Sequence, residues 1–199
     1  MVNESEIFYG FCMNFSSFGI TAEPTPSTWK YRVYYYFDLL GRMLGYEVHT
    51  EDTFTKTDGI NLTGKRIDMT WMSPISKEYV LAFEYENTRD IDDEILKLTS
   101  VIGLRVLVMF RSKYSDKEII DKIVARQNKD NPENSNFLVF VMPDFFKERE
   151  PFEKLAAWLF DPKSQRIAIG EAEGYVGIDG ICSFRNVVWK ERSLGDHTH

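Results

Sequence analysis

Two short, almost wholly apolar runs constrain the fold of this chain more than any other feature. Residues 105–110 read RVLVMF, and residues 137–142 read FLVFVM. Runs this short and apolar are typical of strands that are buried on both faces, as in a parallel sheet. Between the two runs, Ser115 and Glu118 have the spacing of a capping box, which predicts a helix that ends near Gln127. Strand, helix and strand in this order predict a sheet with a helix packed against it.

The remaining patterns extend this unit to an α/β fold, with a mixed central β-sheet flanked by helices on both faces. Apolar residues at spacings of three and four predict a helix from Ser27 or Thr28 to Gly45 and a second helix from about Asp90 to Ile102. Pro151 suits the first position of a further helix ending at Phe160. The predicted strands cover residues 46–51, 66–72 and 79–86, and a β-hairpin turning at Asp179-Gly180 closes the chain.

This order of elements predicts one main domain with a short extension. Residues 1–27 are expected to form an N-terminal strand, over residues 6–15, and a loop that contains Pro24 and Pro26. Residues 28–199 are expected to form a single domain with its core in residues 28–142, followed by a C-terminal helix and β-hairpin. The short link between strands 66–72 and 79–86 predicts that these two strands pair as an antiparallel hairpin.

Composition excludes several classes of protein. The 199 residues include 24 Lys and Arg against 31 Asp and Glu, a net charge of −7, which argues against non-specific coating of nucleic acid. No apolar run approaches the length of a membrane span, so no membrane partner is expected. Cys12 and Cys182 are too few for a disulfide scaffold. The simpler interpretation is that both are free thiols in a reducing compartment, and the alternative is one long-range disulfide bridge. The simpler interpretation predicts a cytoplasmic location.

Three acidic residues lie on predicted strands, where a carboxylate is costly to bury. In the run LAFEYEN, the alternation of a strand places Glu84 and Glu86 on one face, about 7 Å apart. Asp68 interrupts the apolar residues of the preceding strand, and pairing of the two strands brings it opposite Glu84. Three converging carboxylates repel each other and lose hydration, and a divalent cation relieves both costs. Oxygen ligands of this kind favour Mg²⁺ or Mn²⁺ over zinc.

These residues resemble the signature of the PD-(D/E)XK nuclease superfamily, the restriction endonuclease-like proteins. The matching positions are Asp68 in RIDMTW, and Glu84 and Glu86 in VLAFEYEN, and the resemblance covers roughly residues 28–142. It implies a restriction endonuclease-like fold, an Mg²⁺ or Mn²⁺ site at Asp68, Glu84 and Glu86, and phosphodiester hydrolysis in DNA by the same three residues. Two departures stand out: Glu86 replaces the usual lysine, and Ile67 replaces the usual proline. Lys97 or Arg66 would then supply the positive charge, as accessory residues.

Two classes of function follow from this resemblance. The first is a Mg²⁺-dependent nuclease that cuts DNA. The alternative is a catalytically degenerate nuclease fold that acts as a nucleic-acid or protein binding module, which the missing lysine and the net negative charge favour. Seven Lys and Arg against four acids over residues 105–131 hint at a surface for phosphate groups. A third interpretation makes the three acids ordinary surface or salt-bridged residues. The oligomeric state stays open, with a homodimer as one option.

Overall fold

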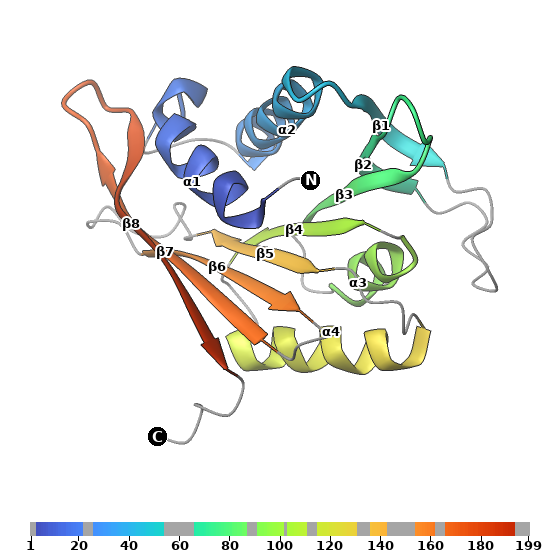
Figure 1. Ribbon diagram of the computed structural model, residues 1–199. Helices are drawn as coiled ribbons and strands as arrows, with labels where there is room; N and C mark the ends of the chain where they lie inside the picture. Colours follow the sequence, from blue (N-terminus) through green and yellow to red (C-terminus); the bar gives the residue numbers. More distant parts are fainter. Residues whose placement is uncertain are drawn as a thin grey trace.

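The computed structural model describes residues 3–21, 26–53, 66–86, 91–101, 103–110, 115–130, 136–142, 154–161 and 166–193. Within these residues the chain forms a mixed α/β fold around one sheet of eight strands, ordered as in the sequence (Figure 1). The helices are α1 (Glu4–Asn14), the 3₁₀ helix η1 (Phe15–Phe18), α2 (Pro26–Met43), α3 (Asp92–Thr99) and α4 (Asp116–Asp130). The strands are β1 (Glu47–Thr53), β2 (Arg66–Met72), β3 (Tyr79–Glu86), β4 (Leu104–Phe110), β5 (Phe137–Met142), β6 (Lys154–Asp161), β7 (Arg166–Val176) and β8 (Cys182–Ser193).

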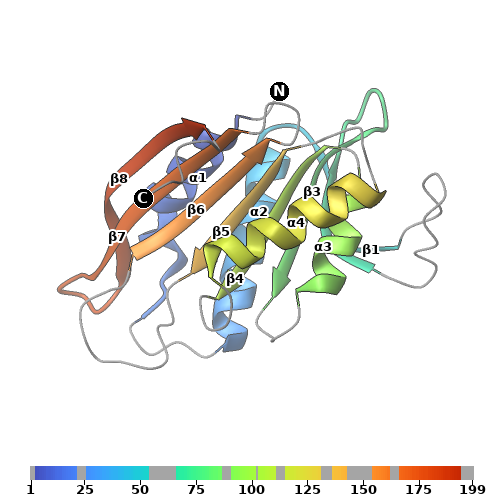
Figure 2. The ribbon, with the colours of Figure 1, turned by 90° about the horizontal axis from the view of Figure 1, so that it is seen from below.

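The centre of the sheet is parallel and its two sides are antiparallel. β4 and β5 run parallel, as the two apolar runs predicted, and β3 runs parallel to β4 as well. β1, β2 and β3 form an antiparallel meander. β5 to β8 also pair antiparallel, and the described turn between β7 and β8 contains Asp179 and Gly180. The helices cover both faces: α1 and α2 lie on one face, and α3 and α4 lie on the other (Figures 1 and 2).

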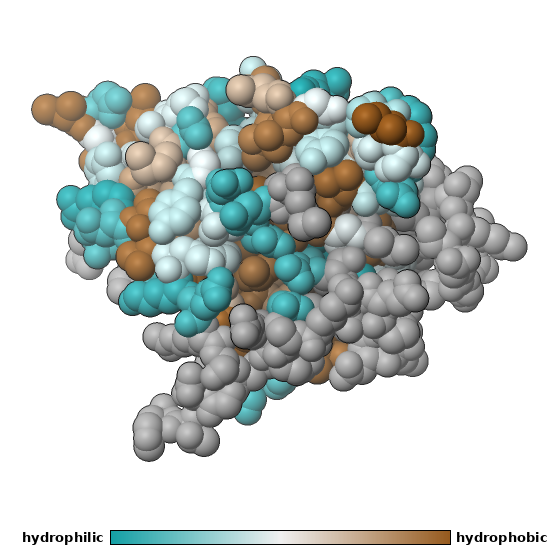
Figure 3. Space-filling view, in the orientation of Figure 1, coloured by the Kyte–Doolittle hydropathy of each residue, from teal (hydrophilic) through white to brown (hydrophobic). Residues whose placement is uncertain are grey.

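Two apolar cores form on the two faces of the sheet. The larger core is rich in aromatic rings and joins α1 and α2 to the sheet through residues such as Phe11, Phe37, Phe83 and Phe140. The smaller core is mostly aliphatic and lies under α3 and α4. Both cysteines are free and buried. Apolar side chains also reach the surface, for example at the tip of the β7–β8 turn, which is brown at the left edge of Figure 3.

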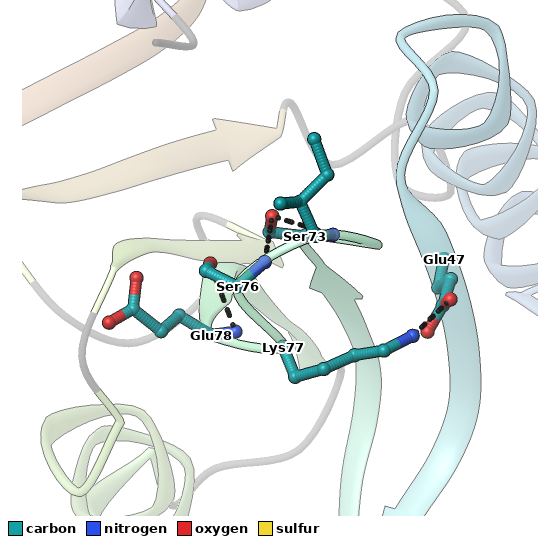
Figure 4. Close-up of polar contacts among 6 residues, drawn as sticks. Glu47, Ser73, Ser76, Lys77 and Glu78 are labelled. Carbon is teal, nitrogen blue, oxygen red and sulfur yellow. Dashed lines mark hydrogen bonds and ion pairs between the residues drawn. The ribbon is translucent and has the colours of Figure 1, made fainter.

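The turn between β2 and β3 connects the two strands that carry the acidic residues (Figure 4). The hydroxyl of Ser73 accepts hydrogen bonds from the backbone N–H groups of Ile75 and Ser76, at 3.3 and 3.1 Å. Lys77 adopts a left-handed backbone with φ of 59°. Its ammonium lies 2.6 Å from the carboxylate of Glu47 in β1. The short link of the sequence therefore forms the antiparallel hairpin that was predicted.

Two predicted elements are wrong. Residues 6–15 were expected to form a strand, but α1 is a helix whose residues Ile7, Phe8, Phe11 and Cys12 are all buried. The N-cap Asn3 accepts a hydrogen bond from the backbone of Ser5, which starts the helix. Because this face enters the larger core, the N-terminal segment is part of the packed body and not an extension with a strand.

The predicted C-terminal helix is also wrong, because its residues form β6. Leu155 and Ala157 enter the larger core, whereas Ala156 and Phe160 enter the smaller core. This segment therefore has apolar residues on two opposite faces, as a strand inside a covered sheet requires. Pairing with β5 and β7 outweighs the helix-start preference of Pro151, a residue outside the described part.

The helix before β4 is shorter than predicted and ends in a constrained turn. α3 ends at Thr99, and Gly103 follows with φ of 117°. A Cβ atom at Gly103 would lie 2.9 Å from the carbonyl oxygens of Tyr79 and Val80. Only glycine combines this backbone conformation with so close an approach. The turn thus allows β4 to start directly beside β3.

Candidate active site

The candidate site lies where β2 begins and β3 ends, between α2 and α3. The register between the strands pairs Met69 with Phe83 and Thr70 with Ala82. One residue beyond this paired stretch, the Asp68 carboxylate accepts a hydrogen bond from the backbone N–H of Tyr85, at 2.9 Å. This bond fixes the Asp68 side chain against β3 at the residue between the two glutamates.

Glu84 is the most buried carboxylate of this site. Its side chain is only 2% exposed, and it follows Ala82 on the face of β3 that packs under α3. The ammonium of Lys97, in the last turn of α3, lies 2.8 Å from Glu84 Oε1. The same ammonium lies 3.5 Å from Glu94 Oε1, on the preceding turn of the helix. Lys97 therefore bridges a carboxylate of the sheet and a carboxylate of its own helix.

The electrostatics of this pair show how costly the charge of Glu84 is. Burial raises the pKa of Glu84 to about 8, and the negative charge of Asp68 contributes to this rise, against the opposing effect of Lys97. Burial alone would lower the pKa of Lys97, but the hydrogen bond and charge of Glu84 hold it above its ordinary value. Lys97 thus stays charged, whereas Glu84 takes up a proton readily unless further positive charge arrives.

Asp68 is also contacted from the opposite side, by α2. The ammonium of Lys30 lies 3.9 Å from Asp68 Oδ1 and 5.1 Å from the centre of the Tyr34 ring. Burial, followed by the charge of Asp68, raises the pKa of the Tyr34 hydroxyl. The Tyr34 ring packs edge-on against Phe83 and Tyr85 of β3. Asp68 therefore stands between a cation from each flanking helix, because its charge also acts on Lys97.

Glu86, the last residue of β3, has a different neighbour. It is half-buried, and its charge is the second cause, after burial, of the raised pKa of Glu94. The site therefore contains two pairs of interacting carboxylates, Asp68 with Glu84 and Glu86 with Glu94. Lys97 lies between the pairs.

The fold places the predicted site residues in different surroundings. Asp68 and Glu84 lie within electrostatic reach of each other, and Lys97, one of the two expected accessory residues, joins them. Arg66, the other accessory residue, is exposed at the start of β2, opposite Thr53 of β1.

Two further residues correct the sequence-based description of the site and its surroundings. Glu94 was not predicted, although its spacing of three from Lys97 on a helix gave a signal. Arg105, counted toward a DNA-facing surface, is fully buried and does not belong to any surface.

The carboxylate oxygens of this site are suited to a hard divalent cation, although they do not form a complete set of metal ligands. Among the described residues, no three His, Cys, Asp or Glu side chains are close enough to form a metal-binding group. Mg²⁺ sites commonly use only one or two carboxylates, with waters and substrate phosphates as the other ligands. Asp68 and Glu84 provide such a pair, and the raised pKa of Glu84 shows that its negative charge is incompletely balanced. A cation at this pair would offset that charge.

Comparisons with protein-family models and with curated proteins find no match to this chain. None of the helices in the described part of the chain combines the length and the apolar character needed to cross a membrane.

Proposed function

We propose that this protein is a Mg²⁺-dependent nuclease with a restriction endonuclease-like fold, acting on phosphodiester bonds in DNA. The observation that carries the proposal is the buried Glu84, held 2.8 Å from Lys97 and within the field of Asp68. The order α2, β1, β2, β3, α3, β4 supports it, because the expected helix, meander with acids, helix and buried strand follow one another.

In this proposal, Asp68 and Glu84 hold the cation, with the backbone carbonyl of Tyr85 as a further oxygen ligand. When bound, Mg²⁺ or Mn²⁺ neutralises charge on the phosphate and lowers the pKa of the attacking water. The hydrogen bond from the Tyr85 N–H keeps Oδ2 of Asp68 oriented, and in this proposal the cation binds beside Oδ1, which the ammonium of Lys30 approaches to 3.9 Å. The burial of Glu84 excludes water from its carboxylate and strengthens its interaction with a cation.

Lys97 takes the place of the lysine that the family motif would have in β3. Its ammonium reaches Glu84 from α3 and is held by Glu94 as well, so it stays in position when Glu84 binds a cation. A cation there can orient the attacking water or stabilise charge on the phosphate. Glu86, next to Glu94, is the proposed base that accepts a proton from the water, or an extra ligand of the metal.

A cleavage assay tests this proposal. Wild-type protein is incubated with supercoiled plasmid and branched DNA in Mg²⁺ and in Mn²⁺, and again in EDTA. We expect cleavage that depends on the metal. Glu84→Gln and Glu86→Ala should each reduce the rate by about 10²-fold or more, the usual range for a lost metal ligand or general base. Glu47→Gln, which removes an exposed carboxylate from β1, is the matched control and should cleave like the wild type.

One observation favours the alternative, a degenerate nuclease fold that binds without cutting. Burial raises the pKa of Glu84 to about 8 even though the ammonium of Lys97 lies 2.8 Å away, so at neutral pH and without metal this carboxyl is mostly protonated. Absence of cleavage in either metal, together with DNA binding that Glu86→Ala leaves unchanged, would support this binding module. If the wild type cleaves DNA in a metal-dependent way, and Glu84→Gln and Glu86→Ala still bind DNA but no longer cleave it, the result would support the enzyme.

A further inference from the structure

The tyrosines of α2 divide into two sets with different environments. Tyr34 packs against β3, and Tyr36 is 8% exposed within the larger core. Tyr31 and Tyr35, in contrast, are 76% and 62% exposed. They are one helical turn apart, so their rings project from neighbouring positions on the outer surface of α2. We call these two residues the tyrosine pair. The inner face of α2 packs on the sheet without them, so the core does not explain two aromatic rings in water.

Positive side chains flank the tyrosine pair. At about 100° per residue along a helix, Tyr31 and Tyr35 lie on the arc between Lys30 and Arg32. Lys30 is partly exposed and Arg32 is exposed. Within the described part of α2 the only acidic residue is Asp38, and its carboxylate is engaged by both Nε and Nη2 of Arg42. Along α2 itself the cations therefore outnumber the acids. Across the helix, however, Lys30 faces Asp68 of β2, and the charge of Glu51 of β1 also acts on Tyr34.

The tyrosine pair also adjoins the candidate active site. Lys30 is the residue next to Tyr31, and its ammonium lies 3.9 Å from Asp68. Tyr34 is three residues from Tyr31, on the adjoining part of the helix surface, and its ring lies beneath the Lys30 ammonium. A ligand that contacts Tyr31 and Lys30 therefore reaches the edge of the carboxylate site.

We infer that Tyr31 and Tyr35 are a stacking surface for the unpaired bases of single-stranded DNA, which leads the strand to the site at Asp68 and Glu84. Exposed aromatic rings with flanking cations are the features that bind single strands, since every base has a face on which a ring can stack. Stacked bases in an intact duplex do not offer these faces. The inference rests on the proposed function, because it names the form of substrate that the site receives.

Fluorescence anisotropy tests the inference with a labelled 20-nucleotide oligo-dT strand and a labelled 20-base-pair duplex. All proteins carry Glu84→Gln and all solutions contain EDTA, so that binding is measured without cleavage. We expect Tyr31→Ala with Tyr35→Ala to weaken single-strand binding at least tenfold, since each lost base–ring stack is worth about 5-fold or more. The double Phe variant, Tyr31→Phe with Tyr35→Phe, should bind like its parent, because the rings remain. Tyr175→Ala removes a tyrosine of β7 that is 37% exposed and is the matched control.

Binding by stacking also predicts a weak dependence on salt. If only Lys30 and Arg32 contact phosphates, the logarithm of the affinity should fall with the logarithm of salt concentration with a slope of roughly −1.4. Equal binding by the Ala and Tyr forms, stronger binding of duplex than of single strand, or no binding at all would overturn the inference. A second copy of the chain on the tyrosine pair would also overturn the inference. Sedimentation would then show a dimer for the parent protein and a monomer for the Ala variant, with equal single-strand binding by both.

The outcome is separable from that of the proposed function. Normal single-strand binding by the Ala variant, in a protein whose wild type cleaves DNA, would overturn the inference alone. Loss of single-strand binding in the Ala variant, in a protein that never cleaves, would support the surface and overturn the nuclease.

Discussion

Strands β3 and β5 both lie beside β4 in the parallel centre of the sheet, yet their side chains differ in kind. All six residues of β5 are buried and all are apolar. β3 is buried from Leu81 to Tyr85, and this stretch includes the carboxylate of Glu84. A buried carboxylate weakens folding unless it is paired. The contrast teaches that β5 contributes apolar packing alone, whereas β3 carries a buried carboxyl group whose ionisation weakens folding unless it is paired.

The largest expected effect is the loss of an aromatic ring from β5. Phe140 contacts the rings of Phe8, Phe11 and Phe37, which joins α1 and α2 to the sheet. Phe140→Ala should therefore lower the free energy of unfolding by about 3–5 kcal/mol, the cost of a large cavity in a core. Urea denaturation measures it. A loss below about 1 kcal/mol would mean that β5 is not the stabilising strand of the comparison.

Glu84, unlike the apolar residues of β5, should make the free energy of unfolding depend on pH. Its pKa is raised from 4.5 to about 8, so the folded protein binds more protons than the unfolded chain between these values. The contribution of Glu84 to stability is therefore fully present below pH 4.5 and is lost as the pH rises through 8. The loss is at most about 1.4 kcal/mol for each pH unit in this interval. In metal-free solution, Glu84→Gln should abolish this part of the fall. Thermal melts from pH 5 to 9 check it, and identical pH profiles for both proteins would refute it.

A smaller effect is expected when Lys97 loses its charge. Lys97→Met leaves the Glu84 carboxyl without its ammonium partner at 2.8 Å. At pH 6 Glu84 is protonated and the loss should be about 1–2 kcal/mol, the usual penalty for an unsatisfied buried group. At pH 9, where Glu84 is ionised, the loss should be larger. Urea denaturation at both pH values measures the difference, and an equal loss at both would show that Lys97 does not compensate the charge of Glu84.

The smallest effect is expected for an ion pair at the surface. Glu47 and Lys77 are 2.6 Å apart, as close as the buried pair, but their side chains are 41% and 59% exposed. Water screens such pairs, so Glu47→Gln should change the free energy of unfolding by less than about 1 kcal/mol. A loss comparable to that of Lys97→Met would mean that burial does not set the difference between the two pairs.

The sequence predicted the centre of this fold well because local and tertiary signals agree there. The runs at β4 and β5 are buried on both faces, and the capping box of α4 forms as expected: the Ser115 backbone N–H donates to the Glu118 carboxylate at 2.7 Å. Residues 6–15 were misassigned because their aromatic content favours a strand, whereas their spacing favours a helix. Phe8, Phe11 and Phe15 recur at three and four, which is the period of a helix.

For the site, the sequence predicted the acids but not all of their neighbours. The alternation of β3 was sufficient to place Glu84 on the face shared with Ala82. Glu94 and Lys30 were not predicted as part of the site, because their roles depend on how α3 and α2 lie on the sheet. Helix placement follows from the packing of both cores, and that information is spread over the whole chain.

The most direct test of this account is calorimetric titration of the metal-free protein with Mn²⁺ at pH 8.5, above the pKa of about 8 for Glu84. We predict heat from one binding site in the wild type and in Glu47→Gln, and none in Glu84→Gln or Asp68→Asn. Weaker binding at pH 6 should accompany it, because a proton then competes with the metal at Glu84. Equal Mn²⁺ binding by wild type and Glu84→Gln, or no binding by the wild type, would contradict the claim that β3 holds Glu84 for a cation.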